Sequence, residues 1–219
     1  NNILKLKGTG VDGVAVVSAI FAKDNIEEAA KGLLALSKEM TEAKPEIKKV
    51  LSIAGTDPTG GAGAQADLKT ITVHKLYGMS VITSLVAQNT MGVYDVIDTP
   101  PEFVAKQLDC VFQDIRPDAV KIGMVSNSKI IDVIVDKLNE YKAENIVVDP
   151  VMVSTSGGKL LSDEACEALI TKLLPLGAVI TPNIPEAEVL CGFEIRNTDD
   201  MIRAAEKISE LVDGGILIK

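Results

Sequence analysis

The sequence has few of the residues on which several protein classes depend. It contains no tryptophan and one histidine, and aromatic residues make up 3% of its 219 residues. Its three cysteines are Cys110, Cys166 and Cys191. They are odd in number, far apart and without a C-x-x-C pair, so neither a disulfide framework nor a zinc site is expected. This cysteine usage suits a reducing compartment, and we expect a cytoplasmic protein.

Long apolar runs and an excess of basic charge are also missing. The longest apolar run, residues 14–22, is interrupted by Ser18 and is far shorter than the roughly 18 residues that a membrane span requires. The 31 acidic residues outnumber the 22 basic ones, for a net charge of -9. Without a basic cluster, such a surface repels a phosphate backbone. We therefore expect neither a membrane nor a nucleic-acid partner.

From residue 49 onward, short apolar runs alternate with segments of helical period. Strands are predicted at 50–54, 80–86, 93–97, 119–124, 146–148, 178–181 and 216–218. Helices are predicted at 64–77, 101–115, 128–141, 163–174, 185–190 and 198–211, with Ser162 and Asn197 as caps before acidic residues. Strands rich in valine and isoleucine favour a mostly parallel sheet covered by helices on both faces. The pattern predicts a three-layer α/β/α sandwich whose site lies beyond the carboxyl ends of the strands.

The first 43 residues differ from this pattern. A strand is predicted at 14–17 and a helix with an apolar stripe at 25–40. One strand and one helix cannot bury their own apolar faces, so this segment must dock on something. We predict an N-terminal piece over 1–43, a polar linker over 44–48 and the main domain over 49–219.

A glycine-rich loop, residues 55–63, follows the first strand of the main domain. Such a loop lets a ligand approach the backbone, and the helix N-terminus after it favours anions. It is not a Walker A loop, because Gly61-Ala62 stands where lysine and Ser/Thr are required. Residues 61–66 match G-x-G-x-x-A, the fingerprint of dinucleotide-binding loops. The match comes too late after the strand, and no ribose-binding acid follows the next strand, so a Rossmann dehydrogenase is not favoured. A plain turn with a helix cap is the simpler alternative.

Two carboxylates, Asp149 and Glu186, follow later strands and are expected at the same edge of the sheet. Mg²⁺ needs such oxygen ligands when it also holds substrate phosphates. Each residue alone could equally be a helix cap or a loop stabiliser. Together with an anion-binding loop, they favour phosphoryl transfer.

Five segments closely resemble hydroxymethylpyrimidine kinase/hydroxymethylpyrimidine phosphate kinase, the ribokinase-like kinases of thiamine biosynthesis. These segments are residues 54–69, 86–90, 121–124, 148–152 and 180–187. The resemblance covers residues 50–219. It implies a ribokinase-like fold, Mg²⁺, and ATP-dependent phosphorylation of 4-amino-5-hydroxymethyl-2-methylpyrimidine and then of its monophosphate. Because this family commonly dimerises, it also implies a homodimer.

The resemblance also assigns roles to single residues. The residues matching the pyrimidine pocket are Gly55, Asp67, Val86, Gln88, Met124 and Val151. Gln88 offers a donor and an acceptor to an aminopyrimidine edge, while the apolar side chains can pack on the faces of the ring. The residues matching the ATP side are Asn183, Glu186 and Lys219, and those matching the metal ligands are Asp149 and Glu186.

Both ends of the sequence depart from the pattern of this kinase family. Family members continue past the strand that ends in Lys219 to a Gly-Thr-Gly-Cys loop, which supplies the anion hole and the catalytic cysteine. This sequence stops at Lys219, so we assign no catalytic residue and expect the 219-residue chain to bind the pyrimidine better than it phosphorylates it. Residues 10–20 resemble the last strand and helix of thiamine phosphate synthase, a TIM barrel, with Ser18 as a remnant phosphate contact. This order suggests a piece of a bifunctional synthase–kinase.

Two other functions remain open at this point. Pyridoxal or pyridoxine kinases share the fold and also act on a hydroxymethyl heteroaromatic ring. Gln88 and the pair Gly123-Met124 favour the aminopyrimidine. Alternatively, the missing anion hole would suit a pyrimidine-binding module without catalysis.

Overall fold

The computed structural model describes residues 3–6, 20, 23–40, 47–152 and 161–219. Its contacts divide the chain into two units, 1–46 and 47–219. In the first unit, η1 (Ile3–Leu6) is a 3-10 turn and α2 (Ile26–Met40) is a helix. Asn25 caps α2, because its side chain accepts a hydrogen bond from the Glu28 amide at 3.0 Å. The helix predicted at 25–40 is confirmed, whereas Ser18 and the strand predicted at 14–17 lie outside the described residues.

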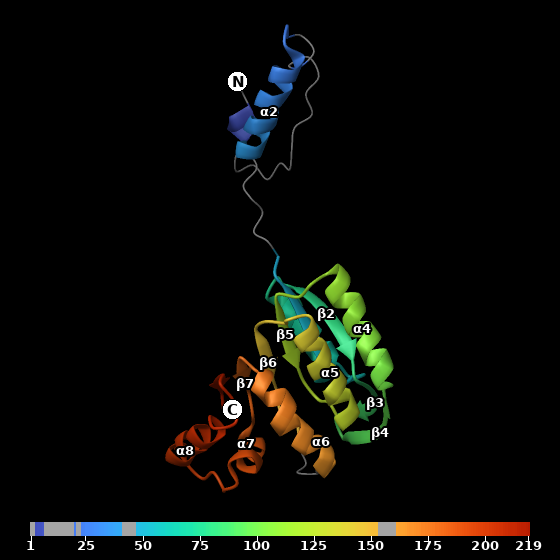
Figure 1. Ribbon diagram of the computed structural model, residues 1–219, viewed down its shortest axis with the longest axis vertical. Coiled ribbons are helices and arrows are strands. Elements are labelled where there is room, and N and C mark those ends of the chain that lie inside the picture. Colours follow the sequence, from blue (N-terminus) through green and yellow to red (C-terminus); the bar gives the residue numbers. More distant parts are fainter. Residues whose placement is uncertain (1–2, 7–19, 21–22, 41–46, 153–160) are drawn as a thin grey trace. The chain divides into compact units, whose positions relative to one another are not determined.

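The second unit is built on a six-stranded parallel sheet with the order β2-β1-β5-β6-β7-β8 (Figure 1). The strands are β1 (Lys49–Ala54), β2 (Tyr77–Ile82), β5 (Ala119–Ile122), β6 (Ile146–Val148), β7 (Val179–Ile180) and β8 (Gly215–Ile216). Ile53 pairs with Val81 on one side and Ile122 on the other, and all three side chains are fully buried. The prediction of a mostly parallel sheet is confirmed. All of its carboxyl ends therefore lie at one edge.

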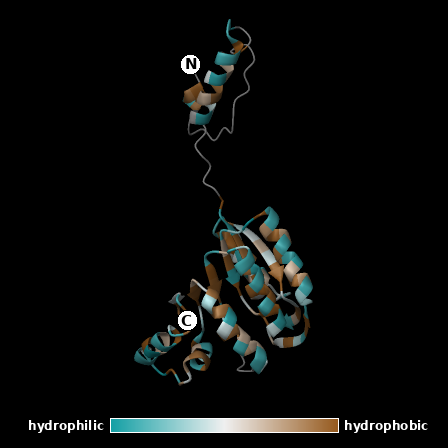
Figure 2. Ribbon diagram, in the orientation of Figure 1, coloured by the Kyte–Doolittle hydropathy of each residue, from teal (hydrophilic) through white to brown (hydrophobic). Residues whose placement is uncertain are grey.

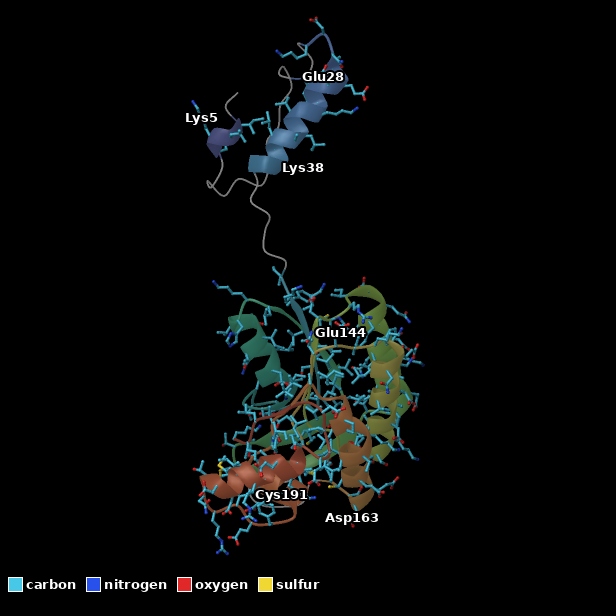
Figure 3. All side chains as sticks on the ribbon, turned by 60° about the vertical axis from the view of Figure 1, so that its left-hand side comes forward. Lys5, Glu28, Lys38, Glu144, Asp163 and Cys191 are labelled. Atoms are coloured by element: carbon cyan, nitrogen blue, oxygen red, sulfur yellow. The ribbon has the colours of Figure 1, made fainter. Side chains whose placement is uncertain are left out.

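Helices cover the apolar strands, which are brown in Figure 2. The helices α4 (Pro101–Asp114), α5 (Ser128–Glu140) and α6 (Asp163–Ala168) lie side by side (Figure 1). Across the sheet from α4 and α5 lies α3 (Gly63–Val73), as Figure 3 shows, and α7 (Ile184–Cys191) packs against α8 (Thr198–Ile208). Of the helices that the structure describes, none has the length and apolar character needed to cross a membrane.

A separate antiparallel hairpin contains β3 (Ser84–Asn89) and β4 (Gly92–Asp98). The prediction of one strand over 80–86 is wrong, because the chain leaves the main sheet at Thr83. The buried Thr83 hydroxyl donates to the Met124 carbonyl oxygen at 3.0 Å, and the Thr83 carbonyl accepts from the Thr99 amide at 2.9 Å. These bonds fix the crossing point between the two sheets.

Two predicted helices end four or more residues early. The helix predicted at 64–77 ends at Val73, because Lys75 adopts a left-handed φ of 60° and β2 begins at Tyr77. The helix predicted at 163–174 divides after α6 into a π-helical turn, η2 (Leu169–Leu173), and a 3-10 turn, η3 (Leu174–Leu176). Pro175, in η3, lacks the N–H that an α-helix would need.

Candidate functional site

The glycine-rich loop after β1 is organised by a buried carboxylate, Asp57, which sequence reasoning did not single out. Asp57 is 3% exposed. It accepts hydrogen bonds from the amides of Thr59 at 2.9 Å, Gly61 at 3.0 Å and Ala62 at 2.8 Å. The expectation that this loop is an open anion-binding loop therefore needs correction, because three of its amides already bind an internal anion.

The surroundings of Asp57 also keep it charged. Burial alone would raise the pKa of Asp57, but hydrogen bonds from the Gln88 side chain, Thr59 and Ala62 outweigh it and hold that pKa well below its usual range. The Asp57 amide in turn donates to the Gln65 side-chain oxygen at 2.8 Å. The loop thus carries a fixed negative charge at neutral pH.

The strand β3 runs beside this loop. The Thr56 amide donates to the Ser84 carbonyl at 3.0 Å, and the Val86 amide donates to the Thr56 hydroxyl at 2.9 Å. Along β3, Ser84 and Val86 are buried and Gln88 is half-buried, while the residues between them are exposed. The alternation places Val86 and Gln88 on the side that faces the loop.

Gly55 and Met124 lie against each other where β1 and β5 end. A Cβ atom on Gly55 would stand 3.0 Å from the Met124 methyl carbon and 2.7 Å from the Ser84 hydroxyl oxygen. A side chain at position 55 would therefore press on the Met124 methyl group and on the buried Ser84 hydroxyl. Val151, half-buried, follows Asp149 beyond the neighbouring strand β6.

Asp67 belongs to a polar cluster that reaches into the sheet. Its carboxylate accepts from the Ser52 hydroxyl at 2.6 Å and from the Lys121 ammonium at 3.0 Å. Ser52 and Lys121 are direct neighbours across β1 and β5. Sequence reasoning placed Lys121 in a family motif without giving it a role. A lysine within an otherwise apolar strand was the available signal.

The other end of the edge carries Asp149 and Lys219. The Lys219 ammonium donates to Asp149 Oδ1 at 2.8 Å, and the Thr181 hydroxyl lies 3.4 Å from the same oxygen. These residues come from the ends of β6, β7 and β8. The sheet thus brings together three residues that lie up to 70 positions apart in the sequence.

Asn183 and Glu186 form a capping box at the start of α7. Glu186 accepts from the Asn183 amide at 2.9 Å, and Asn183 accepts from the Glu186 amide at 2.9 Å. Burial raises the pKa of Glu186, and the negative charge of Asp149 adds to this, whereas hydrogen bonds from main-chain amides and the Lys219 charge oppose it. Glu186 therefore acts as part of a helix cap, and its pKa also depends on the charge of Asp149.

The donor set fits a magnesium ion held together with substrate phosphates. Among the residues described, no cluster of three or more histidine, cysteine or acidic side chains could enclose a metal ion. Mg²⁺ is commonly bound through one or two carboxylates plus phosphate oxygens and water. Asp149 follows β6 and Glu186 lies in the first turn of α7 after β7, so these are two carboxylates at this edge that could serve as such ligands.

A family model described as phosphomethylpyrimidine kinase matches residues 57–219. A hydroxymethylpyrimidine/phosphomethylpyrimidine kinase from Escherichia coli is 46% identical over 170 residues, which are 77% of this chain and 64% of that protein. A thiamine biosynthesis bifunctional protein from Geobacter sulfurreducens is 44% identical over 210 residues, 96% of this chain and 42% of that protein. The chain thus spans less than two thirds of the length of these curated relatives.

Solved structures show the same likeness. A phosphomethylpyrimidine kinase from Clostridium difficile is 53% identical and superposes with a TM-score of 0.74, covering 78% of this chain and 74% of that one. A pyridoxal kinase from Staphylococcus aureus in complex with AMP-PCP is 38% identical with a TM-score of 0.70, covering 79% of this chain and 63% of that one. The ribokinase-like α/β fold follows from these likenesses.

Proposed function

This chain belongs to the phosphomethylpyrimidine kinase family, and we propose that it phosphorylates 4-amino-5-hydroxymethyl-2-methylpyrimidine and then the monophosphate of that alcohol, with ATP as donor. The relatives named hydroxymethylpyrimidine/phosphomethylpyrimidine kinases support this proposal. The observation that carries it is the pairing of Lys219 with Asp149 at 2.8 Å at the carboxyl edge of the sheet, the same edge at which Gly55 and Met124 lie against each other.

At the ring-binding end, the proposed pocket combines one polar side chain with apolar ones. The Gln88 amide would pair with the amino group and ring nitrogen of the pyrimidine. Val86 and Met124 would pack on the faces of the ring, as apolar side chains do in most small-molecule sites. Asp67, held by Ser52 and Lys121, would bound the pocket on the α3 side.

At the phosphate-binding end, the pyrimidine hydroxyl would attack the γ-phosphorus of ATP. An O–P bond forms, the bond from the γ-phosphorus to the ADP oxygen breaks, and the proton of the hydroxyl passes to solvent water. Lys219 would lie against the phosphates and offset their charge. Mg²⁺, held by Asp149 and Glu186, would supply further neutralisation of the phosphate oxygens. Asn183 would keep Glu186 in place through the capping box.

We also propose that residues 1–43 are the end of a thiamine phosphate synthase-like barrel, that 44–48 are a linker and that the kinase domain starts at 49. The bifunctional relative from G. sulfurreducens matches 96% of this chain, whereas the E. coli kinase matches 77%. The extra length that matches is consistent with a synthase–kinase order. The test is the intact mass of the natural protein, which should be large enough to include a synthase domain before Asn1.

The proposed partner of the kinase domain is a second copy of the chain. All residues of β4 are exposed, and an isolated two-stranded hairpin is marginally stable in water. Its large exposed apolar side chains are Leu85, Met91, Val93, Tyr94, Val96 and Ile97. Light scattering should give a dimer mass for the wild type and a monomer mass for Ile97→Asp, and a monomeric wild type would contradict the proposal.

The cysteines support a cytoplasmic location within this proposal. Cys110 is exposed, Cys166 is half-buried and Cys191, labelled in Figure 3, is buried. All three are free thiols. Free thiols persist in reducing compartments, where disulfides are rare.

Pyridoxal phosphorylation is the second candidate, favoured by the 38% identity to the S. aureus pyridoxal kinase. ADP release measured with each alcohol and Mg-ATP separates the two. We expect a higher kcat/KM for the aminopyrimidine, because Gln88 pairs with its amino edge. A higher kcat/KM for pyridoxal would replace the first proposal by the second.

A further inference from the structure

Ser84, the first residue of β3, has a hydroxyl group that makes no hydrogen bond within the protein. Its side chain is fully buried, and its oxygen has no hydrogen-bond partner in the part of the chain that the structure describes. The neighbouring hydroxyl of Thr83, also buried, donates to the Met124 carbonyl at 3.0 Å. Leaving a buried hydroxyl without a partner costs free energy. The Ser84 hydroxyl is therefore available to a group that the chain does not supply.

This hydroxyl borders the space proposed for the ring. A Cβ atom on Gly55 would stand 2.7 Å from the Ser84 oxygen and 3.0 Å from the Met124 methyl carbon. Because Gly55 has no side chain, only the Met124 methyl group lies beside the hydroxyl above this stretch of backbone. Met124 is half-buried, and a methionine side chain has three rotatable bonds. Its movement uncovers the Ser84 hydroxyl towards the ring pocket.

The register of β3 gives a second, independent observation. Ser84, Val86 and Gln88 occupy alternate positions, and the residues between them are exposed. The three side chains therefore share one face of the strand. At about 3.3 Å per residue, Ser84 and Gln88 lie about 13 Å apart along β3. A six-membered ring between them can meet Gln88 at one edge and Ser84 at the opposite edge, with Val86 against its face.

We propose that the Ser84 hydroxyl donates a hydrogen bond to N1 of the bound pyrimidine, the ring nitrogen opposite the amino-bearing carbon, and so selects a pyrimidine over a pyridine ring. The inference rests on the proposed function, in which Gln88 pairs with the amino group and the adjacent nitrogen, N3. N1 is then an acceptor that loses its hydrogen bonds to water on entering the site. A serine hydroxyl can donate to it, and a site with such a donor disfavours a ring that lacks the acceptor.

The test is calorimetric titration of the 219-residue chain with 4-amino-5-hydroxymethyl-2-methylpyrimidine and with 2-amino-3-hydroxymethyl-6-methylpyridine. The second compound differs from the first only in a C–H group in place of N1. Both are titrated at a pH at which the two rings are neutral. The ratio of the two affinities should be about tenfold lower in Ser84→Ala than in the wild type, because only the pyrimidine loses a hydrogen bond. Comparing the two proteins cancels the difference in basicity between the rings.

Thr83→Val is the matched control, because it removes a buried hydroxyl that already has a partner. Thr83→Val should lower the melting temperature and leave the ratio of affinities unchanged. Ser84→Ala should show the opposite pattern, with an equal or higher melting temperature and a lower ratio. A merely structural role of Ser84 would move the melting temperature without moving the ratio.

A second measurement requires no variant. In wild-type protein, the ¹⁵N resonance of labelled N1 should stay near its value in water, because the serine replaces the lost water. A shift to the value found in an apolar solvent would overturn the inference.

The outcomes separate the inference from the proposed function. If Ser84→Ala keeps the wild-type ratio, or weakens the binding of both rings equally, the contact with N1 is refuted while pyrimidine binding by the wild type still supports the proposed function. If the wild type binds pyridoxal but not the pyrimidine, the proposed function is refuted and the inference with it.

Discussion

Adding one methyl group at Gly55 should disturb both stability and ligand binding. In Gly55→Ala the new Cβ would stand 2.7 Å from the Ser84 hydroxyl oxygen and 3.0 Å from the Met124 methyl carbon. Ser84 is fully buried and cannot retreat, whereas Met124 is flexible and half-buried. The Met124 side chain should therefore move towards the proposed ring pocket. Overpacking of this kind costs about 1–3 kcal/mol, partly offset by about 0.4–1 kcal/mol from the stiffer unfolded chain.

Gly61→Ala is the matched control in the same loop. Its Cβ would meet Asp57 Oδ2 at 3.7 Å and the Thr59 hydroxyl at 3.8 Å, which are ordinary contact distances. We expect Gly61→Ala to be neutral or stabilising by about 0.5 kcal/mol, and Gly55→Ala to be destabilised by about 1–2 kcal/mol in urea unfolding. Calorimetry should show weaker pyrimidine binding for Gly55→Ala alone. Equal effects of the two substitutions on stability and binding would refute the packing argument.

Ser84 allows a further check on this reasoning. Among the described residues, its hydroxyl oxygen has no hydrogen-bond partner, and it is the atom nearest to the added Cβ. Ser84→Ala should therefore be neutral or stabilising by up to about 1 kcal/mol, and should recover part of the stability lost in Gly55→Ala. If the change in unfolding free energy of the double variant equals the sum of the two single changes, the contact between the Cβ atom and the Ser84 hydroxyl is not the cause.

Two further predictions concern charged side chains. Hydrogen bonds from Lys137 and Tyr141 lower the pKa of Asp109, so Asp109→Asn should cost about 1 kcal/mol at pH 7. A lowered pKa stabilises the fold fully above the unfolded value near 4, and this stabilisation is lost as the pH falls towards the lowered value. The loss of unfolding free energy in Asp109→Asn should therefore be constant from pH 7 to about pH 5 and shrink below pH 4. A loss that does not depend on pH in urea unfolding would contradict this explanation. Lys219→Met removes the cation that pairs with Asp149 and should weaken Mg-ATP binding by about tenfold in calorimetry, leaving pyrimidine binding unchanged. If Lys219→Met weakens the binding of Mg-ATP and of the pyrimidine equally, the cause is unfolding of the variant.

Features decided by neighbouring residues could be predicted from the sequence. The helix starts after Ser162 and Asn197 are confirmed, because each cap accepts an amide three positions ahead, at 3.2 Å and 3.0 Å. The parallel sheet could also be predicted, since valine and isoleucine without polar alternation require cover on both faces. The break at Thr83 could not, because it depends on a bond to Met124, 41 positions away.

The candidate site could likewise be predicted from the sequence only in part. Parallel strands place their carboxyl ends at one edge, so the expectation that Asp149 and Glu186 lie at one edge followed from the fold class. The role of Asp57 was missed because an acidic residue in a glycine-rich loop looks unfavourable for binding an anion. Its role depends on the fold of the loop, which brings the amides of Thr59, Gly61 and Ala62 to its carboxylate. Likewise, the partner of Asp67, Lys121, lies 54 positions away.

The most direct test of the proposed function is the mass spectrum of the products formed from 4-amino-5-hydroxymethyl-2-methylpyrimidine and Mg-ATP by this chain. The account predicts a slowly formed product one phosphoryl group heavier, followed by a second product heavier by another phosphoryl group, with one ADP for each group transferred. Unchanged pyrimidine, alongside pyridoxal that becomes phosphorylated in a parallel reaction, would contradict it.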